Sequence, residues 1–315
     1  MPGAERPSDG RLDAEELPYL TRHRSRLAVR IEGGIRRSLG DSPGALEDYA
    51  GPPGDPGLVG PDSMAWKVHA DLPGMLIGGF AALMFQTLHP LAMAGVAAHS
   101  RFREDPLGRL QRTARFVAGT TFGAMPLVEE LIGEVAAVHE RVRGIAPDGR
   151  PYSAADPDLL TFVHVTEVSS FLAGFQRYSP RPLLRVEKDQ YFDEVAEIAR
   201  RLGARDVPTS LNAVRAYLDQ ILPELVRSPQ SDEALEFLRR PVGTAMSDAV
   251  AQRIIVTAAA DLLPRPIRAL ITPSHYLPGR RAVIVAAAGS FAVATRWAIG
   301  PSPVVTRSLE RVSAA

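Results

Sequence analysis

The stretch that decides the fold runs from residue 72 to residue 98 and reads LPGMLIGGFAALMFQTLHPLAMAGVAA. It contains no Asp, Glu, Lys or Arg, and it is long enough to count as a transmembrane candidate. Gln86 and His89 lie near its middle, however, and Pro90 would break or kink a helix there. We therefore expect two buried segments that meet near Pro90, with a membrane span as the alternative. The shorter apolar run 282–295 fits a core helix.

Helical patterns extend in both directions from this stretch. Asp105-Pro106 combines an N-cap residue with proline at the first helical position. Gly51 to Asp62 contains four prolines and four glycines, so no helix can cross it. Alternating β-branched runs joined by hairpin signals are not found, and residues 145–158 are expected to be a connector with a tight Pro-Asp-Gly turn. The fold class is therefore all-α, one large helical domain, with helices expected at 14–38, 63–71, 105–122, 126–143, 159–178, 186–202, 211–222, 232–238, 244–263 and 282–297.

Composition excludes several classes of protein. The chain has 315 residues, 45% of them apolar and 23% charged, which is typical of a globular protein with a sizeable core. Its formal net charge is zero, which argues against a protein built to bind nucleic acid. The absence of cysteine excludes disulfides, zinc-thiolate sites, iron–sulfur clusters and thiolate-bound haem. The first thirty residues show no secretory signal, so a cytoplasmic location is expected, and the strong preference for arginine over lysine indicates bacterial coding bias.

His139 is the most informative of the seven histidines. Leu131, Ile132, Val135 and Val142 share its helix face, so its side chain projects from an apolar stripe. A neutral imidazole that faces a hydrophobic cavity is what a proximal haem ligand requires. The alternative is a core histidine hydrogen-bonded to a neighbour, and the pattern alone leaves both open.

Two further histidines lie in apolar surroundings. His164 shares its helix face with Leu160, Val168 and Phe171, and the same two interpretations apply to it. His89 precedes the expected break in the apolar stretch, where it could line a pocket or end a helix.

Familiar catalytic motifs are missing. A di-iron bundle needs Glu three residues before His, but Leu, Trp, Gln, Val, Ala and Thr occupy those positions here. The His-Glu-x-x-His, Gly-x-Ser-x-Gly, Walker and Gly-x-Gly-x-x-Gly motifs are absent as well.

Arginines cluster early in the 105–122 helix. Arg109 can share a face with Arg112 or Thr113, because residues three and four apart are neighbours on a helix. A guanidinium group binds carboxylates in bidentate fashion, and haem propionates are such a target. The alternative is a solvated basic face, or a salt bridge to Glu104 or Asp105.

Several motifs in order resemble the MpaB-type oxygenase family, whose catalytic domain is shared with latex-clearing rubber oxygenases. The similarity covers about residues 66–224. It is carried by His89-Pro90, Gly95-Val96, His99-Ser100-x-Phe102, Asp105-Pro106-x-Gly108-Arg109-Leu110-x-Arg112-Thr113, Val138-His139-x-x-Val142-x-Gly144, Asp148-Gly149-x-Pro151-Tyr152-Ser153 and Asp156-Pro157-x-Leu159-Leu160-x-Phe162-Val163-His164.

The resemblance implies a globin-reminiscent helical bundle that binds haem b noncovalently and uses dioxygen on a hydrophobic small molecule. It implies His139 as the proximal iron ligand, with His164 as the rival and His89 near the cofactor. Arg109, Arg112 and Thr113 correspond to the Arg-x-x-Lys-Thr motif of the rubber oxygenases and are implied to be catalytic, Arg109 and Thr113 also binding the cofactor. Residues 63–315 would form the oxygenase domain, and 1–62 an N-terminal tail, helix and loop packed on it.

One departure bears on the substrate. The lysine that can occupy the distal iron position in rubber oxygenases is Arg112 here, and arginine is a poor ligand because it keeps its proton. A smaller apolar or aromatic metabolite is therefore expected instead of rubber. The rival hypotheses are a noncatalytic haem carrier or sensor, and a membrane-peripheral helical binding protein.

Overall fold

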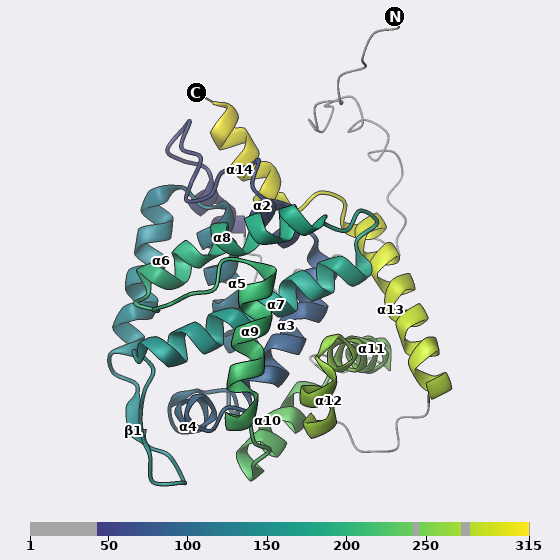
Figure 1. Cartoon of the computed structure of the whole chain (residues 1–315). Helices are drawn as coiled ribbons and strands as arrows, with labels where there is room; N and C mark the ends of the chain where they lie inside the picture. The colour runs from purple at the N-terminus through teal and green to yellow at the C-terminus, as the bar shows by residue number, and fades with distance from the viewer. Residues whose placement is uncertain (1–42, 242–245, 272–277, 315) are drawn as a thin grey trace, which may run out of the picture.

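The computed structural model describes residues 43–241, 246–271 and 278–314. The helix expected at 14–38 lies outside these residues, as do His23 and His275. Apart from one two-stranded hairpin, all regular secondary structure in the described residues is helical, so the all-α prediction is confirmed (Figure 1).

The apolar stretch forms two helices, as predicted. α3 (Leu72–Gln86) and α4 (Pro90–His99) meet at an angle of 102°. His89 caps α4, since its Nδ1 accepts the backbone N–H of Ala92 at 3.4 Å. Proline supplies no N–H to continue α3, and it suits the first turn of α4, which explains the break.

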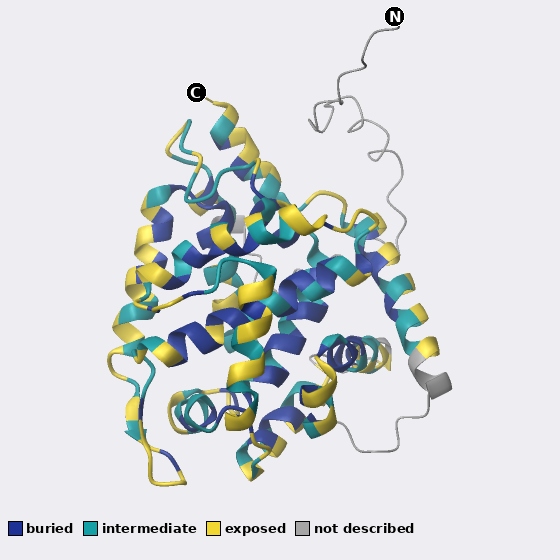
Figure 2. Ribbon diagram, in the orientation of Figure 1, coloured by how far each residue is buried: buried dark blue, intermediate teal, exposed yellow. Residues whose placement is uncertain are grey.

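α3 packs at backbone distance against α7 (Pro157–Tyr178). A Cβ atom at Gly78 would lie 2.6 Å from the carbonyl oxygen of Ser170, and one at Gly174 would meet the carbonyl oxygen of Gly74. Glycine is therefore needed on both helices where they cross. Figure 2 shows buried residues concentrated along these two helices in the middle of the molecule.

The other elements surround this central pair. One hydrophobic cluster joins α7 to α2 (Met64–His69) and α8 (Arg185–Arg201). Another joins α2 to α5 (Pro106–Phe122) and α6 (Met125–His139). The remaining elements are η3 (Pro43–Tyr49), α9 (Leu211–Ile221), η4 (Leu222–Glu224), α10 (Pro229–Arg239), α11 (Met246–Leu262), α12 (Arg265–Ile271), α13 (Pro278–Ile299) and α14 (Pro303–Ser313).

The secondary structure predicted from the sequence is wrong at the end of α6 and misses two helices. The helix expected to reach residue 143 ends at His139, and the chain continues as the antiparallel strands β1 (Arg143–Ile145) and β2 (Pro151–Ser153). Gly149, at φ 85°, provides the left-handed residue of the turn between them. The short helices α12 and α14 were not predicted, because proline-rich flanks hide their few turns.

The buried side chain of Arg311 joins the end of the described chain to its beginning. Its guanidinium donates to the carbonyl oxygens of Asp55 at 3.0 Å, Tyr49 at 3.2 Å and Phe122 at 2.9 Å. Three carbonyls that α14, η3 and α5 bring together are thus satisfied by one side chain.

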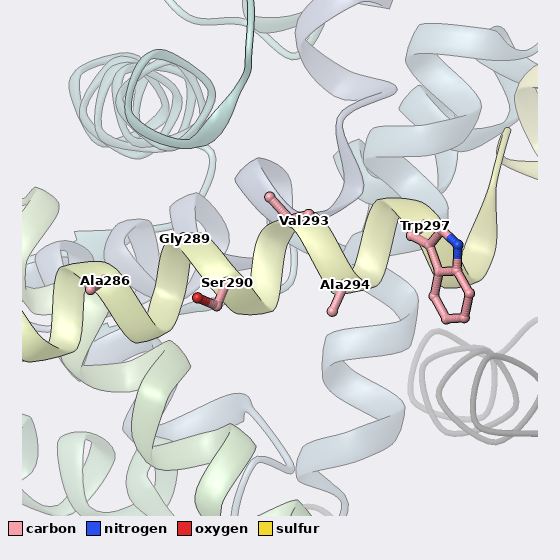
Figure 3. Close-up of a pocket in the computed structure, with 6 residues that line it drawn as sticks. All are labelled: Ala286, Gly289, Ser290, Val293, Ala294 and Trp297. Atoms are coloured by element: carbon pink, nitrogen blue, oxygen red, sulfur yellow. The ribbon is translucent and has the colours of Figure 1, made fainter.

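α13 lies at the edge of the molecule beside α11 (Figure 1). Within Ala282–Ile299, which is long and apolar enough to cross a membrane, only 22% of the residues are buried. The prediction of a core helix was therefore wrong, because one side packs on α11 and α3 while Val293 and Trp297 are 67% and 56% exposed. Figure 3 shows Ser290, Ala294 and Trp297 projecting from one side of α13, on an open, mostly apolar surface. If the bent α3–α4 pair is counted as one span, it is a second candidate by composition.

Candidate active site

His139 ends α6, and its Nδ1 atom is buried without a hydrogen-bond partner among the described residues. The predicted apolar stripe is present, since Leu131 and Ile132 on its face are buried. Burial lowers the pKa of His139, which keeps the imidazole neutral at physiological pH. A neutral ring with a free buried nitrogen can bind a metal or accept a hydrogen bond from a ligand.

Arg109 is largely enclosed and has no carboxylate partner in the described part of the chain. Its Nη1 donates to the hydroxyl of Ser100 at 2.9 Å. Desolvation, and then the nearby charge of Arg112, lowers the pKa of Arg109. A cation in this position is well placed to bind an anionic group, because an anion would offset its desolvation cost.

The α5–α6 hairpin places Arg109 and His139 at the same level. The helices are antiparallel and adjacent, as ion pairs from Arg115 to Glu130 at 3.5 Å and to Glu134 at 3.4 Å show. Arg109 precedes the end of α5 by 13 positions, and His139 follows the start of α6 by 14 (122 − 109 and 139 − 125). At about 1.5 Å per residue, both lie roughly 20 Å from the turn.

Arg112 and Thr113 are exposed. Arg112 Nη1 lies 3.3 Å from Asp105 Oδ2, so it forms the ion pair that was the alternative interpretation. The Thr113 hydroxyl donates to the carbonyl oxygen of Arg109 at 3.2 Å, within its own helix. Neither side chain joins Arg109 in its enclosed position.

His89 is occupied by structural contacts. Besides capping α4, it places its Nε2 3.9 Å from Glu224 Oε2, and its ring centroid is 4.6 Å from that of Phe162. Burial is the largest cause that lowers its pKa. These contacts match the helix-end alternative.

His164 lines a cavity of about 30 Å³ in the interior. Burial, followed by the charge of Arg200, lowers its pKa to about 4. Glu167, one turn further along α7, lines the same cavity, and burial raises its pKa to about 7. Glu167 is the only acidic residue of α7 beyond its first turn, a signal that sequence reasoning overlooked.

His69 is the other group that sequence reasoning missed. Its Nδ1 lies 2.7 Å from the Thr121 hydroxyl, and its Nε2 lies 3.0 Å from the Tyr191 hydroxyl. Thr121 donates its one hydrogen to the carbonyl oxygen of Val117, so it must accept from Nδ1–H. The Tyr191 hydroxyl lies 3.0 Å from Nε2 and 3.3 Å from the carbonyl oxygen of Val168, so its one hydrogen has two possible acceptors. Burial lowers the pKa of His69 to about 3, which keeps the ring neutral. No local pattern reveals this, because the partners are 52 and 122 positions away.

The described residues contain no group of three or more His, Asp or Glu side chains that could hold a metal ion by themselves. His139 is thus a single donor, which could ligate an iron only as part of a cofactor that supplies the other ligands. His139 and Arg109 together suit such a cofactor if it carries carboxylates.

Comparison with known proteins identifies the family. The family model described as "ER-bound oxygenase mpaB/B'/Rubber oxygenase, catalytic domain" matches residues 66–297, nearly three quarters of the chain. Neither the curated proteins nor the solved structures contain a match to the chain, so the globin-like arrangement stays a prediction. The match begins in α2 and ends in α13, and thus includes every candidate residue discussed above. The chain belongs to the MpaB and rubber oxygenase catalytic-domain family.

Proposed function

We propose that this protein is a haem b-dependent oxygenase that uses dioxygen to oxidise a hydrophobic small molecule. The observation that carries the proposal is the buried Nδ1 of His139, at the level of Arg109. Among the described residues, neither this nitrogen has a hydrogen-bond partner nor this arginine an anionic one. Membership of an oxygenase family supports the reaction class. The neutral ring would hold the iron, and Arg109 would pair with a propionate.

His139 fits this role better than His164. The cavity at His164 measures about 30 Å³, which is enough for a water molecule but far too small for a porphyrin. His139 is half-buried at the end of α6, and its neighbours Val138 and Glu140 are exposed. A large planar ligand could therefore approach His139 from solvent. His89 already holds a helix end, and it is the weakest of the three.

Haem b, when bound, supplies the dioxygen-activating chemistry, and the chain's residues set orientation and access. Arg109 would fix the cofactor's orientation through a charge-assisted hydrogen bond that water competes with poorly, because the arginine is largely enclosed. Arg112 contributes no iron ligand, since it is exposed and paired with Asp105. The substrate would be held by burial of its apolar surface, which favours a small metabolite without charges.

We propose that the protein is located in the cytoplasm and contacts membranes peripherally. The family description includes an ER-bound oxygenase, and α13 offers an exposed apolar side. Sedimentation with liposomes tests this, and protein that stays in the supernatant would contradict it.

The experiment for the cofactor is the visible absorption spectrum of haem-replete protein. We expect a strong Soret band that is lost or shifted in His139→Ala and kept in His164→Ala, the matched control in another buried position. Loss only in His164→Ala would move the iron to α7, and no band in the parent protein would refute haem binding.

Catalysis is tested separately. Oxygen consumption that depends on an added apolar or aromatic compound supports an oxygenase. Haem binding without turnover over a broad panel of such compounds would favour a carrier or sensor.

A further inference from the structure

The cavity beside His164 lies between four helices, is lined mostly by apolar side chains and is partly open. Its polar members are His69 of α2, Thr120 of α5, and His164 and Glu167 of α7. The rest of the lining is Phe116, Val117, Val168, Phe171, Val195 and Ile198. A polar cluster inside such walls must satisfy its hydrogen bonds within the cavity.

Two of the polar members are already engaged. Both ring nitrogens of His69 are used by Thr121 and Tyr191. The Thr120 hydroxyl donates its hydrogen to the carbonyl oxygen of Phe116 at 2.8 Å. Its oxygen can still accept a hydrogen bond, because a hydroxyl has two lone pairs.

His164 and Glu167 have no such partners. His164 is only 9% exposed, and neither side chain forms a hydrogen bond or ion pair with any residue that the structure describes. A buried polar group without a partner costs about 1–3 kcal/mol, and His164 is such a group. Glu167 is half-buried beside it on the same cavity wall, so the two polar side chains together point to a ligand there.

The volume identifies the ligand. A cavity needs about 10–15 Å³ to hold a water molecule, and a buried water usually makes two to four hydrogen bonds. About 30 Å³ with three available polar groups meets both conditions and leaves no room for an organic molecule.

We propose that His164, Glu167 and Thr120 bind one water molecule in this cavity, and that Glu167 exchanges a proton with bulk solvent through it. A protonated Glu167 donates to the water, and an ionised Glu167 accepts from it. The net change is one proton taken up or released. This proposal does not depend on the haem.

The charges around Glu167 agree with this exchange. Burial raises its pKa to about 7, and no cation stabilises its ionised form. From α2 it faces His69, which stays neutral, and from its own helix His164, which also stays neutral. From α8 the Tyr191 and Glu194 side chains lie nearby, and Arg200 acts on His164. The residues of α5 that line the cavity carry no titratable group.

The test is infrared difference spectroscopy of the full chain between about pH 5 and about pH 9, a range that spans the expected transition. We expect a carboxylic acid C=O band that disappears with a midpoint near 7, is absent in Glu167→Gln, and remains in Glu197→Gln. Glu197 is the matched control, because it lies on α8 in a surface ion pair with Arg201. A band that survives in Glu167→Gln, or a parent protein without one, overturns the proton exchange.

The water is tested independently by a high-resolution crystal structure of the parent protein. Density for one water within hydrogen-bond distance of His164 and Glu167 is expected, and an empty cavity overturns the site. Thr120→Val keeps the shape and removes one acceptor, so it should shift the C=O band without abolishing it. An unchanged band would remove Thr120 from the site.

Discussion

Two adjacent glycines of α3 provide a sharp test of the central helix crossing. A Cβ atom at Gly78 would lie 2.6 Å from Ser170 O and 2.9 Å from Phe171 Cα, both backbone atoms. A Cβ atom at Gly79 would meet only Phe171 Cε1, at 3.6 Å, an ordinary contact. Gly78→Ala and Gly79→Ala therefore make the same chemical change on the same helix, with and without a backbone collision.

The magnitudes follow from these distances. Alanine in a helix interior is favoured over glycine by about 1 kcal/mol, so Gly79→Ala should stabilise the protein by roughly 0.5–1 kcal/mol. At Gly78 the helices must separate by at least 0.4 Å to restore a 3.0 Å contact (3.0 − 2.6). Overpacking of this kind costs about 1–3 kcal/mol, or more where both atoms are backbone. After the gain in helix propensity is included, we expect Gly78→Ala to lower the free energy of unfolding by about 2 kcal/mol.

The assay is urea unfolding followed by circular dichroism, with both variants and the parent protein at one protein concentration. The free energies of unfolding of the two variants should differ by about 3 kcal/mol, which corresponds to roughly 4–5 °C in Tm for a chain of this length. Equal stabilities, or a stabilised Gly78→Ala, would refute the backbone contact between α3 and α7.

Three further predictions concern the charged residues. Because Glu167 binds a proton more tightly when folded, stability present below pH 4.5 is lost as the pH rises to about 7. In urea unfolding across this pH range, the free energy of unfolding of the parent should fall by about 3 kcal/mol relative to that of Glu167→Gln. If the difference between the two proteins stays constant with pH, the raised pKa of Glu167 is wrong. Arg311→Met should cost about 3 kcal/mol by unfolding, because three buried carbonyls lose their donor, whereas the surface variant Arg307→Met should cost under about 0.5. Arg109→Gln should weaken haem binding about tenfold or more in titrations. Arg112→Gln should change the haem affinity by less than about twofold. Equal losses in the two variants would refute the proposal that only Arg109 binds the cofactor.

Much of the fold could be predicted because its signals are local. Pro90 interrupts an uncharged stretch, and the two helices meet there. Asp105 was expected to cap α5, and its carboxylate accepts the N–H of Gly108 at 2.9 Å. Both depend on residues within a few positions of each other. The family was also recognised correctly from ordered motifs between His89 and His164.

The details of the site could not be predicted in the same way. Arg109 and Arg112 look equivalent in the sequence, but only the structure shows that one is enclosed and the other is paired on the surface. His69 depends on partners from two distant helices. The ligand roles of His139 and His164 stay predictions.

The Arg311 contacts also constrain the order of events during synthesis. Arg311 is 262 positions from Tyr49 and 189 positions from Phe122, whose carbonyl oxygens accept its hydrogen bonds. Early regions of a nascent chain therefore emerge from the ribosome long before their last buried carbonyls can be satisfied. The crossing of α3 and α7, by contrast, is complete once Tyr178 has emerged. The central helices can pack once α7 has emerged, whereas the junction of η3, α5 and α14 closes only after α14 has emerged.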